Sequence, residues 1–318
     1  MAFTFEMFPI QCLFLCTAIF TPFYSSVMAS YIPVRLAYNV IEPVGGITGK
    51  SPIIFLHGVT ESKEYWADVP QVVANATRRK VYVLDARNHW DSDWSNEFTF
   101  DLNSDDLVDF MDKMNIPKAI LIGHSMGGMS AIRTSLKKPE KVEMAIVKDM
   151  YVRKLPKNVL NELVDYTILL QEAVDHMPYN LDKEAAQKFI QNYLISRLPK
   201  DYPALEKIKA NSRLAGDLKL NPDGRYRVKS NLKILEKAMR NADTVMEDPS
   251  GLYHGPACFI YGALSPFLVG ADKHHIKQFF LKVEFVEIED ATHDVHIDQP
   301  LHFTDAVLKF IFQNEILS

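Results

Sequence analysis

The chain has 318 residues, of which 47% are hydrophobic and 24% charged, and its formal net charge is −5. These values are ordinary for a globular protein with a large core, and the mild negative charge argues against a nucleic-acid-binding protein or a polybasic membrane-binding surface. Three cysteines, Cys12, Cys16 and Cys258, imply no disulfide framework. Cys258 lies in an apolar run and is expected to be a small buried hydrophobe.

Residues 1–29 form an apolar N-terminal segment for which we predict a targeting or anchoring role. The run from 7 to 24 is uncharged, and small residues ending at Ala29 resemble the cleavage site of a secretory signal peptide. The segment departs from that pattern because Glu6 precedes the run and no Lys or Arg does. A mitochondrial transit peptide would be rich in Arg, and no Arg occurs before Arg35.

Short apolar runs then alternate with helical patterns. Residues 34–40 alternate between apolar and polar, which predicts a half-exposed antiparallel strand, whereas 53–56 are wholly apolar, as expected where both sheet faces are covered. The expected strands are 34–40, 53–56, 80–85, 119–122 and 142–148, and the expected helices are 61–74, 101–114 and 129–138. This alternation predicts an α/β fold with a mostly parallel, doubly wound sheet.

The alternation stops between residues 152 and 250, where we expect a helical cap, or lid, inserted over the edge of the sheet. Its expected helices are 158–177, 182–198, 204–215 and 231–242, with a turn at 221–224 and no buried strand. Alternation resumes with strands at 257–262 and 283–288 and helices at 273–280 and 301–312. The predicted core is therefore 30–151 and 251–318, and the predicted cap is 152–250.

The run Gly123-His124-Ser125-Met126-Gly127 is typical of a nucleophile elbow. The bare Gly-x-Ser-x-Gly pattern is short, but an apolar strand precedes it and a helical pattern follows it, and the elbow requires both. Small residues let the strained turn form, and the helix N-terminus directs N–H groups at the same point. We therefore predict Ser125 as a nucleophile.

A serine nucleophile needs a base, and we predict His293 because it follows the last strand, at the sheet edge where the elbow also points. His296 is the alternative base, or else a structural residue that packs on the final helix. A metal site made of His293, Asp294 and His296 is not favoured, because their spacing matches no known ligand motif closely. We predict no metal and no cofactor.

The oxyanion hole and the acid complete the predicted site. Two N–H groups must face the developing negative charge, and Met126 and Val59 are the expected donors. The usual acid position follows the strand that ends at Gly262, but no carboxylate occurs there. Asp149, at the end of the strand after the elbow helix, is the predicted acid, and Ser265 is expected to hydrogen-bond the acid or the histidine. The competing interpretation of Asp149 is a helix-cap or loop residue.

Four motifs occur in order: Phe55-Leu56-His57-Gly58, Asp85-Ala86-Arg87-Asn88-His89, Gly123-His124-Ser125-Met126-Gly127-Gly128 and Thr292-His293-x-x-His296. Together they resemble the α/β-hydrolases, and within them the family of alpha/beta hydrolase domain-containing protein 11 and its bacterial esterase relatives. This resemblance implies a serine esterase or lipase that acts on lipid esters such as diacylglycerol, often in the mitochondrion. It also supports Asp149 as the acid.

The chain departs from that family at several positions. Leu264 stands in place of the family's Asn. Trp90 and Asp294 stand where the family usually has Gly and Trp, and we expect these two residues to change the pocket. The resemblance points to the mitochondrion, whereas the N-terminal segment looks secretory.

The expected partner is a small ester or lipid, with a possible membrane-surface contact through the N-terminus or the lid. Either the pocket or the cap's own core is expected to contain Leu163, Ile168, Leu169, Phe189 and Leu194. The alternative function is a non-catalytic binding or scaffolding protein with this fold.

Overall fold

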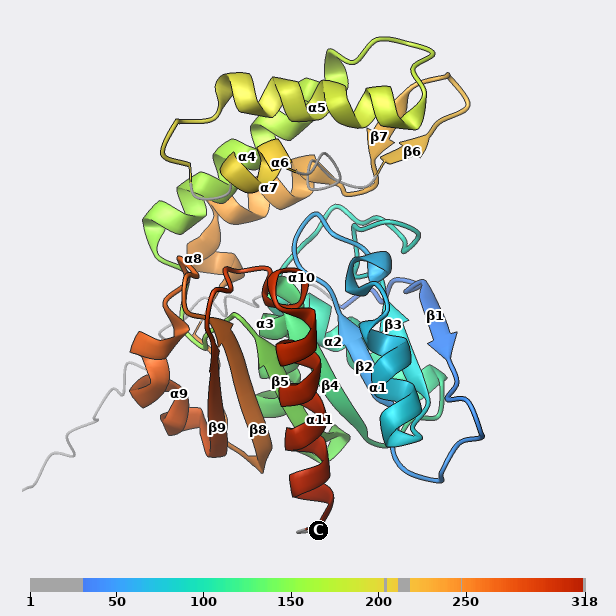
Figure 1. The fold of residues 1–318 in the computed structure, drawn as a ribbon, viewed down its shortest axis with the longest axis vertical. Helices are drawn as coiled ribbons and strands as arrows, with labels where there is room; N and C mark the ends of the chain where they lie inside the picture. Colours follow the sequence, from blue (N-terminus) through green and yellow to red (C-terminus); the bar gives the residue numbers. More distant parts are fainter. Residues whose placement is uncertain (1–30, 203–204, 211–217, 247, 317–318) are drawn as a thin grey trace, which may run out of the picture. The chain divides into compact units, whose positions relative to one another are not determined.

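The computed structural model describes residues 31–202, 205–210, 218–246 and 248–316. The described residues from Pro33 onward form one compact unit (Figure 1). The predicted targeting segment, 1–29, lies outside the described residues. Among the helices of the described residues, none is both long enough and apolar enough to cross a membrane.

A seven-stranded sheet with the order β1-β3-β2-β4-β5-β8-β9 forms the centre of the unit. Its strands are β1 Tyr38–Ile41, β2 Ile53–Leu56, β3 Val81–Leu84, β4 Ala119–His124, β5 Val142–Lys148, β8 Tyr253–Gly262 and β9 Phe280–Ile288. The β1 strand pairs with β3 in the antiparallel sense, and all other neighbours are parallel. The predicted doubly wound α/β fold is confirmed.

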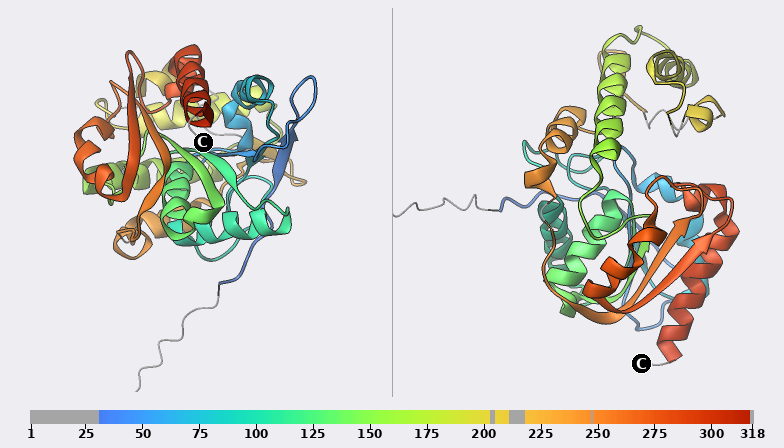
Figure 2. Two further views of the ribbon diagram at one scale, coloured as in Figure 1. Left: turned by 90° about the horizontal axis from the view of Figure 1, so that it is seen from below. Right: turned by 90° about the vertical axis from the view of Figure 1, so that its left-hand side faces the viewer.

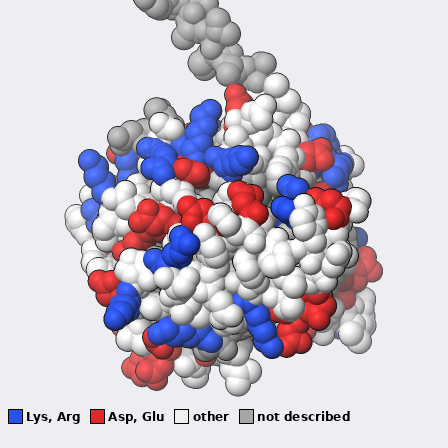
Figure 3. Space-filling view, turned by 90° about the horizontal axis from the view of Figure 1, so that it is seen from above, with Lys and Arg blue, Asp and Glu red and all other residues white. Residues whose placement is uncertain are grey.

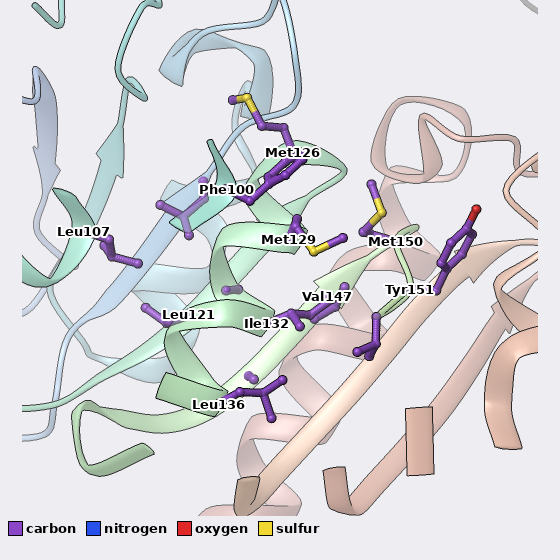
Figure 4. Close-up of a cluster of buried hydrophobic side chains, with 14 of the residues drawn as sticks. Phe100, Leu107, Leu121, Met126, Met129, Ile132, Leu136, Val147, Met150 and Tyr151 are labelled. Atoms are coloured by element: carbon purple, nitrogen blue, oxygen red, sulfur yellow. The ribbon is translucent and has the colours of Figure 1, made fainter. Parts of the chain in front are cut away.

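Helices cover both faces of the sheet (Figure 2). On one face lie α1 Val69–Thr77 and α11 Pro300–Ile316, and on the other lie α2 Phe100–Lys113, α3 Met126–Lys137 and α9 Lys273–Phe279. Both faces of the short strand β2 are buried, which explains why its sequence is wholly apolar. Ile53 and Phe55 pack in the cluster under α1 and α11, whereas Ile54 and Leu56 pack in the cluster under α2 and α3. Figure 4 shows part of the second cluster, around α3, β4 and β5.

The predicted helix at 61–74 is wrong as one element. The structure has a 3-10 helix, Lys63–Trp66, and then the separate helix α1, which begins at Val69. Ala67 has a φ of 48° between them, a value that no α-helix allows. Pro70 explains the new start, because proline is tolerated in the first turn of a helix but not in its interior.

We call the segment between β5 and β8 the cap. Its described elements are α4 Lys157–Asp175, α5 Lys183–Arg197, α6 Leu205–Ala210, β6 Leu218–Leu220, β7 Tyr226–Val228, α7 Leu232–Arg240 and α8 Ala242–Val245. The cap also contains the hairpin of β6 and β7, which the sequence pattern did not predict; only Leu218 and Val228 of its strands are buried, so the hairpin does not contradict the expectation of no buried strand. Its turn is the predicted one: Gly224 has a φ of 80° and donates its N–H to the Asn221 carbonyl at 3.0 Å. Strands of three residues are too short for an alternating pattern to reveal them.

The cap has a hydrophobic cluster of its own, built on the facing sides of α4 and α5 and on the hairpin. The N-terminal half of α4 belongs instead to the cluster under α2 and α3. The cap lies over the carboxyl ends of the parallel strands (Figure 1). Seen from the cap side, Lys and Arg side chains are interspersed with Asp and Glu side chains (Figure 3). In the described residues Cys258 is fully buried, as expected, and burial raises the pKa of its thiol.

Candidate active site

Ser125 lies at the apex of the turn between β4 and α3, with φ 50° and ψ −114°. Its N–H donates to the Lys148 carbonyl at 3.1 Å, which fastens the apex to β5. The turn is so tight that a Cβ on Gly123 would collide with the Gly127 carbonyl, and a Cβ on Gly127 would collide with the Leu56 carbonyl. The two glycines are therefore required by close backbone approach, and Ser125 keeps a small exposed surface toward a cavity.

The predicted acid and base meet at this edge of the sheet. Asp149 directly follows β5, is fully buried, and has a φ of 50°. Its Oδ2 lies 2.6 Å from His293 Nδ1, and its Oδ1 accepts the Gly262 N–H at 3.2 Å. The His293 ring stacks on Phe267, with 4.1 Å between centroids and an interplanar angle of 8°. Ser125 and His293 line the same cavity.

Ser265 occupies the position where the fold usually has an acid. Its hydroxyl donates to Asp149 Oδ2, so this position contributes a hydrogen bond to the carboxylate in place of a carboxylate of its own. The expectation that Ser265 bonds the acid or the histidine is confirmed. Its neighbour Leu264 is exposed. Asp149 lies in the loop after β5 and has three partners, and none of them is a helix N-terminus, which contradicts the helix-cap interpretation of this residue.

The two predicted oxyanion donors lie on the loop after β2 and at the start of α3. Among the described residues, the N–H groups of Val59 and Met126 have no hydrogen-bond partner. His57 holds the loop: its Nε2 accepts the Ala86 N–H at 3.0 Å, so its Nδ1 carries the proton and donates to the Gly58 carbonyl at 2.7 Å. The His57 carbonyl accepts the Gly127 N–H at 3.0 Å, which ties the loop to the elbow.

The cavity beside Ser125 has a volume of about 920 Å³. Its apolar and aromatic lining includes Tyr65, Trp66, Leu163, Tyr166, Tyr202 and Phe267. Of the five cap residues expected in the pocket or in the cap's core, only Leu163 lines the cavity. Leu169, Phe189 and Leu194 pack in the cap's own cluster, and Ile168 packs against the core.

The contacts of His296 are those of a structural residue and not of a catalytic base. Its Nε2 donates to the Tyr65 carbonyl at 3.0 Å, so its Nδ1 is the acceptor for the ammonium of Lys148. Burial lowers the pKa of His296 to about 2. Both ring nitrogens are thus occupied, and the structure does not bring His293, Asp294 and His296 together as metal ligands.

The sequence motifs did not predict that three polar residues lie behind the elbow: Glu61, Tyr65 and Lys148. Lys148 is fully buried at the end of β5, 5.1 Å from the ring centroids of Tyr65 and of Trp66, and burial lowers its pKa to about 8. Glu61 Oε2 accepts the Gly58 N–H at 2.6 Å, and burial raises the pKa of Glu61 to about 7. A lysine that directly follows the apolar run 144–147 at the end of β5 is the one sequence signal for this cluster.

His124 and Asp294 extend the same cluster. The His124 ring stacks on Tyr65, 5.5 Å between centroids, and burial holds its pKa well below the usual range. Tyr65 donates its hydroxyl proton to Asp294 Oδ1. One ligand atom each from Glu61, His124 and Asp294 lies within 4.8 Å of the others, so these residues are placed to hold a metal ion.

The two substitutions expected to change the pocket differ in outcome. Asp294 lines the cavity. Trp90 does not line it, so the expectation is wrong for this residue. Its ring lies 3.4 Å from Lys229 Nζ, at the foot of the cap's hairpin, and its N–H donates to the Lys229 carbonyl. With a φ of 47°, Trp90 occupies a conformation that favours glycine.

Comparison with known proteins agrees with this geometry. Residues 51–300 match the model of the alpha/beta hydrolase fold. The chain is 27% identical over 288 residues to the sn-1-specific diacylglycerol lipase ABHD11 of Danio rerio, covering 90% of this chain and 86% of that protein. It is 25% identical over 303 residues to ethanol acetyltransferase 1 of Cyberlindnera fabianii, covering 87% and 86%. A solved structure described as a marine microorganism esterase has a TM-score of 0.69 and 27% identity, covering 87% of this chain and 99% of that one. The family model spans most of the chain, and the chain belongs to the α/β-hydrolase fold family.

Proposed function

We propose that the protein is a serine hydrolase that cleaves carboxylic esters, with acylglycerol-like lipid esters as its substrate class. The observation that carries the proposal is the contact of 2.6 Å between Asp149 and His293 at a cavity that Ser125 also lines. A buried carboxylate on one imidazole nitrogen leaves the other nitrogen to act as a base. The strained elbow and the two N–H groups without partners support the same chemistry.

In this mechanism His293 Nε2 removes the proton from Ser125 Oγ, and the oxygen forms a bond to the ester carbonyl carbon. The negative charge of the tetrahedral intermediate faces the N–H groups of Val59 and Met126. The intermediate collapses, the bond to the alcohol breaks, and His293 returns the proton to the departing alcohol. Water then repeats the sequence on the acyl-enzyme and releases the acid, while Asp149 stabilises the protonated imidazole.

A lipid substrate is supported by two observations. The cavity of about 920 Å³ is large enough for an acyl chain, and the cap contributes apolar and aromatic side chains to it. The relatives include proteins named sn-1-specific diacylglycerol lipase in fish and mouse. The cap would then act as a lid that keeps water from the acyl-enzyme.

The test uses a fluorophosphonate probe and a panel of p-nitrophenyl and glycerol esters of increasing chain length. Wild type should be labelled, and Ser125→Ala should be neither labelled nor active. Ser130→Ala is the matched control, because Ser130 lies one turn along α3 and bonds only the helix backbone. Ethanol added to the assay shows whether an alcohol competes with water for the acyl-enzyme. Persistent labelling of Ser125→Ala contradicts the nucleophile, and a wild type that resists the probe and cleaves no ester favours a binding protein.

A further inference from the structure

Three potential metal ligands from separate segments converge behind the elbow. Glu61 follows β2, His124 ends β4, and Asp294 precedes the short helix α10, Val295–Asp298. One ligand atom from each lies within 4.8 Å of the other two. We infer that Glu61, His124 and Asp294 form a binding site for a divalent transition-metal ion, with Zn²⁺ as the first candidate.

The burial and hydrogen bonding of His124 distinguish this cluster from an ordinary group of acidic residues. The His124 side chain is fully buried, the Lys148 backbone is its one hydrogen-bonding neighbour among the described residues, and Nε2, which faces Glu61 Oε1 at 3.4 Å, makes no hydrogen bond. Buried polar groups without partners are rare in native proteins, and an ion is one of the accepted reasons for them. A neutral, buried imidazole is also the form of histidine that binds metals.

The spacing fits a metal better than a hydrogen bond. His124 Nε2 lies 3.4 Å from Glu61 Oε1, outside acceptable hydrogen-bond geometry. Two ligands each about 2.1 Å from a tetrahedral metal are separated by about 3.4 Å, the edge of the tetrahedron. The pair is therefore separated as if it shared an ion.

The donor set selects the class of ion. Ca²⁺ and Mg²⁺ prefer ligand sets made wholly of oxygen, whereas one imidazole with two carboxylates suits Zn²⁺ and similar transition metals. Three protein ligands leave a fourth position open. Glu61 and Asp294 both line the cavity, so an ion has a path of entry.

Neighbouring groups already orient the two carboxylates. The Gly58 N–H donates to Glu61 Oε2 at 2.6 Å, which leaves Oε1 directed toward His124. The Tyr65 hydroxyl donates to Asp294 Oδ1. Outer partners of this kind hold carboxylate ligands in place in metal sites.

The positive charge of Lys148 should weaken metal binding at this site, so replacing this residue gives a further test of the proposal. Its buried ammonium interacts with Glu61 and Asp294 and is held by His296 Nδ1 among aromatic rings. A second positive charge so close weakens the binding of a cation. Replacing Lys148 with Met, which has a similar length and packs well against rings, should therefore tighten metal binding.

The experiment is titration calorimetry of the metal-free full chain with Zn²⁺, checked by metal analysis after dialysis. Wild type should bind about one ion at this site. Glu61→Gln and Asp294→Asn should each weaken it by at least about tenfold, Lys148→Met should strengthen it, and Asp68→Asn should leave it within about twofold. Asp68 lines the same cavity outside the cluster. Circular dichroism checks that each variant is folded.

The measurement is of binding, so its result does not depend on the ester-hydrolase proposal and can be repeated in Ser125→Ala. Two outcomes overturn the site: no Zn²⁺ binding by folded wild type, or binding that Glu61→Gln and Asp294→Asn leave unchanged. The second outcome would assign the ion to exposed residues such as His274. Weaker binding by Lys148→Met would contradict the ammonium's role as a competitor of the ion.

Discussion

His293 Nδ1 and Asp149 Oδ2 lie 2.6 Å apart although the two residues are separated by 144 positions in the chain. Asp149 follows β5 and His293 follows β9, and the strand between them in the sheet is β8. Asp149 therefore reaches across the end of β8, and its N–H donates to the Ile260 carbonyl of that strand at 2.9 Å. Ser265, in the loop after β8, lies in this gap and donates to the same carboxylate oxygen.

Replacing Asp149 with Asn should lower kcat by a factor on the order of 10³–10⁴ with little change in KM. The amide cannot stabilise a protonated imidazole as a carboxylate does, and it favours the wrong tautomer of His293. The measurement is steady-state kinetics on a short-chain p-nitrophenyl ester, with circular dichroism as the check on folding. Activity within about threefold of wild type would mean that another group is the acid.

Replacing Ser265 with Ala should have a smaller effect, about a tenfold loss in kcat. The change removes one hydrogen bond to a charged group, worth about 1.5–3 kcal/mol, while Asp149 keeps its contacts with Gly262 and His293. Because Ser265 bonds the Asp149 carboxylate and does not line the cavity, KM should stay unchanged. Equal rises in KM and losses in kcat would point to a general distortion of the site.

Gly123→Ala should destabilise the fold by about 3 kcal/mol, because the added Cβ would overlap the Gly127 backbone in the elbow. Gly49→Ala is the control, since no atom lies within 4 Å of the Cβ position there. It should change stability by less than about 1 kcal/mol. Urea unfolding of both variants is the measurement, and similar midpoints for the two would contradict the tight packing of the elbow.

His89 should make the protein less stable as the pH falls from 6.5 toward about 3. Burial lowers its pKa from 6.5 to about 3 in the folded state, so between these values the unfolded chain binds more protons than the native one. Its Nδ1 donates to the Arg87 carbonyl and its Nε2 accepts the Thr60 N–H, which fixes the neutral form.

The matching variant is His89→Asn, which cannot titrate. The difference in free energy of unfolding between wild type and the variant should shrink by up to about 1.4 kcal/mol per pH unit across this window. Denaturant unfolding at several pH values measures the free energy of unfolding of both proteins. Subtracting one free energy from the other at each pH removes the contribution of the carboxylates, which the two proteins share. A difference that stays constant would show that His89 is accessible to protons in the folded state.

Leu163→Trp should shift the preference toward short acyl chains. Leu163 reaches the cavity from α4, and the larger indole would fill part of the space proposed for the acyl chain. We expect kcat/KM for a long-chain ester to fall by about tenfold or more, with the acetate ester within about threefold. Leu169→Trp is the control because Leu169 packs in the cap's own cluster. Equal losses for both chain lengths would place the acyl chain elsewhere.

The elbow and the wholly apolar strands could be predicted because their determinants are contiguous. In Gly123–Gly127 a strand, a tight turn and a helix follow one another, so local sterics define the conformation of Ser125. The burial of Ile53–Leu56 likewise follows from four adjacent apolar residues. Local patterns failed where one residue interrupts them, as Pro70 does, or where an element is as short as β6.

The partners of the candidate site depend on strand order, which no local pattern encodes. Asp149 reaches His293 because β5, β8 and β9 are neighbours, and only that arrangement gives Ser265 its contact with the carboxylate. The same reason brings together Glu61, His124 and Asp294. They come after β2, at the end of β4 and after β9, respectively, so their contact depends on how these strands are arranged in the sheet. The sequence alone thus determined the strand, turn and helix around Ser125, and the tertiary structure decided which distant charges surround it, because those contacts come from packing between segments far apart in the chain.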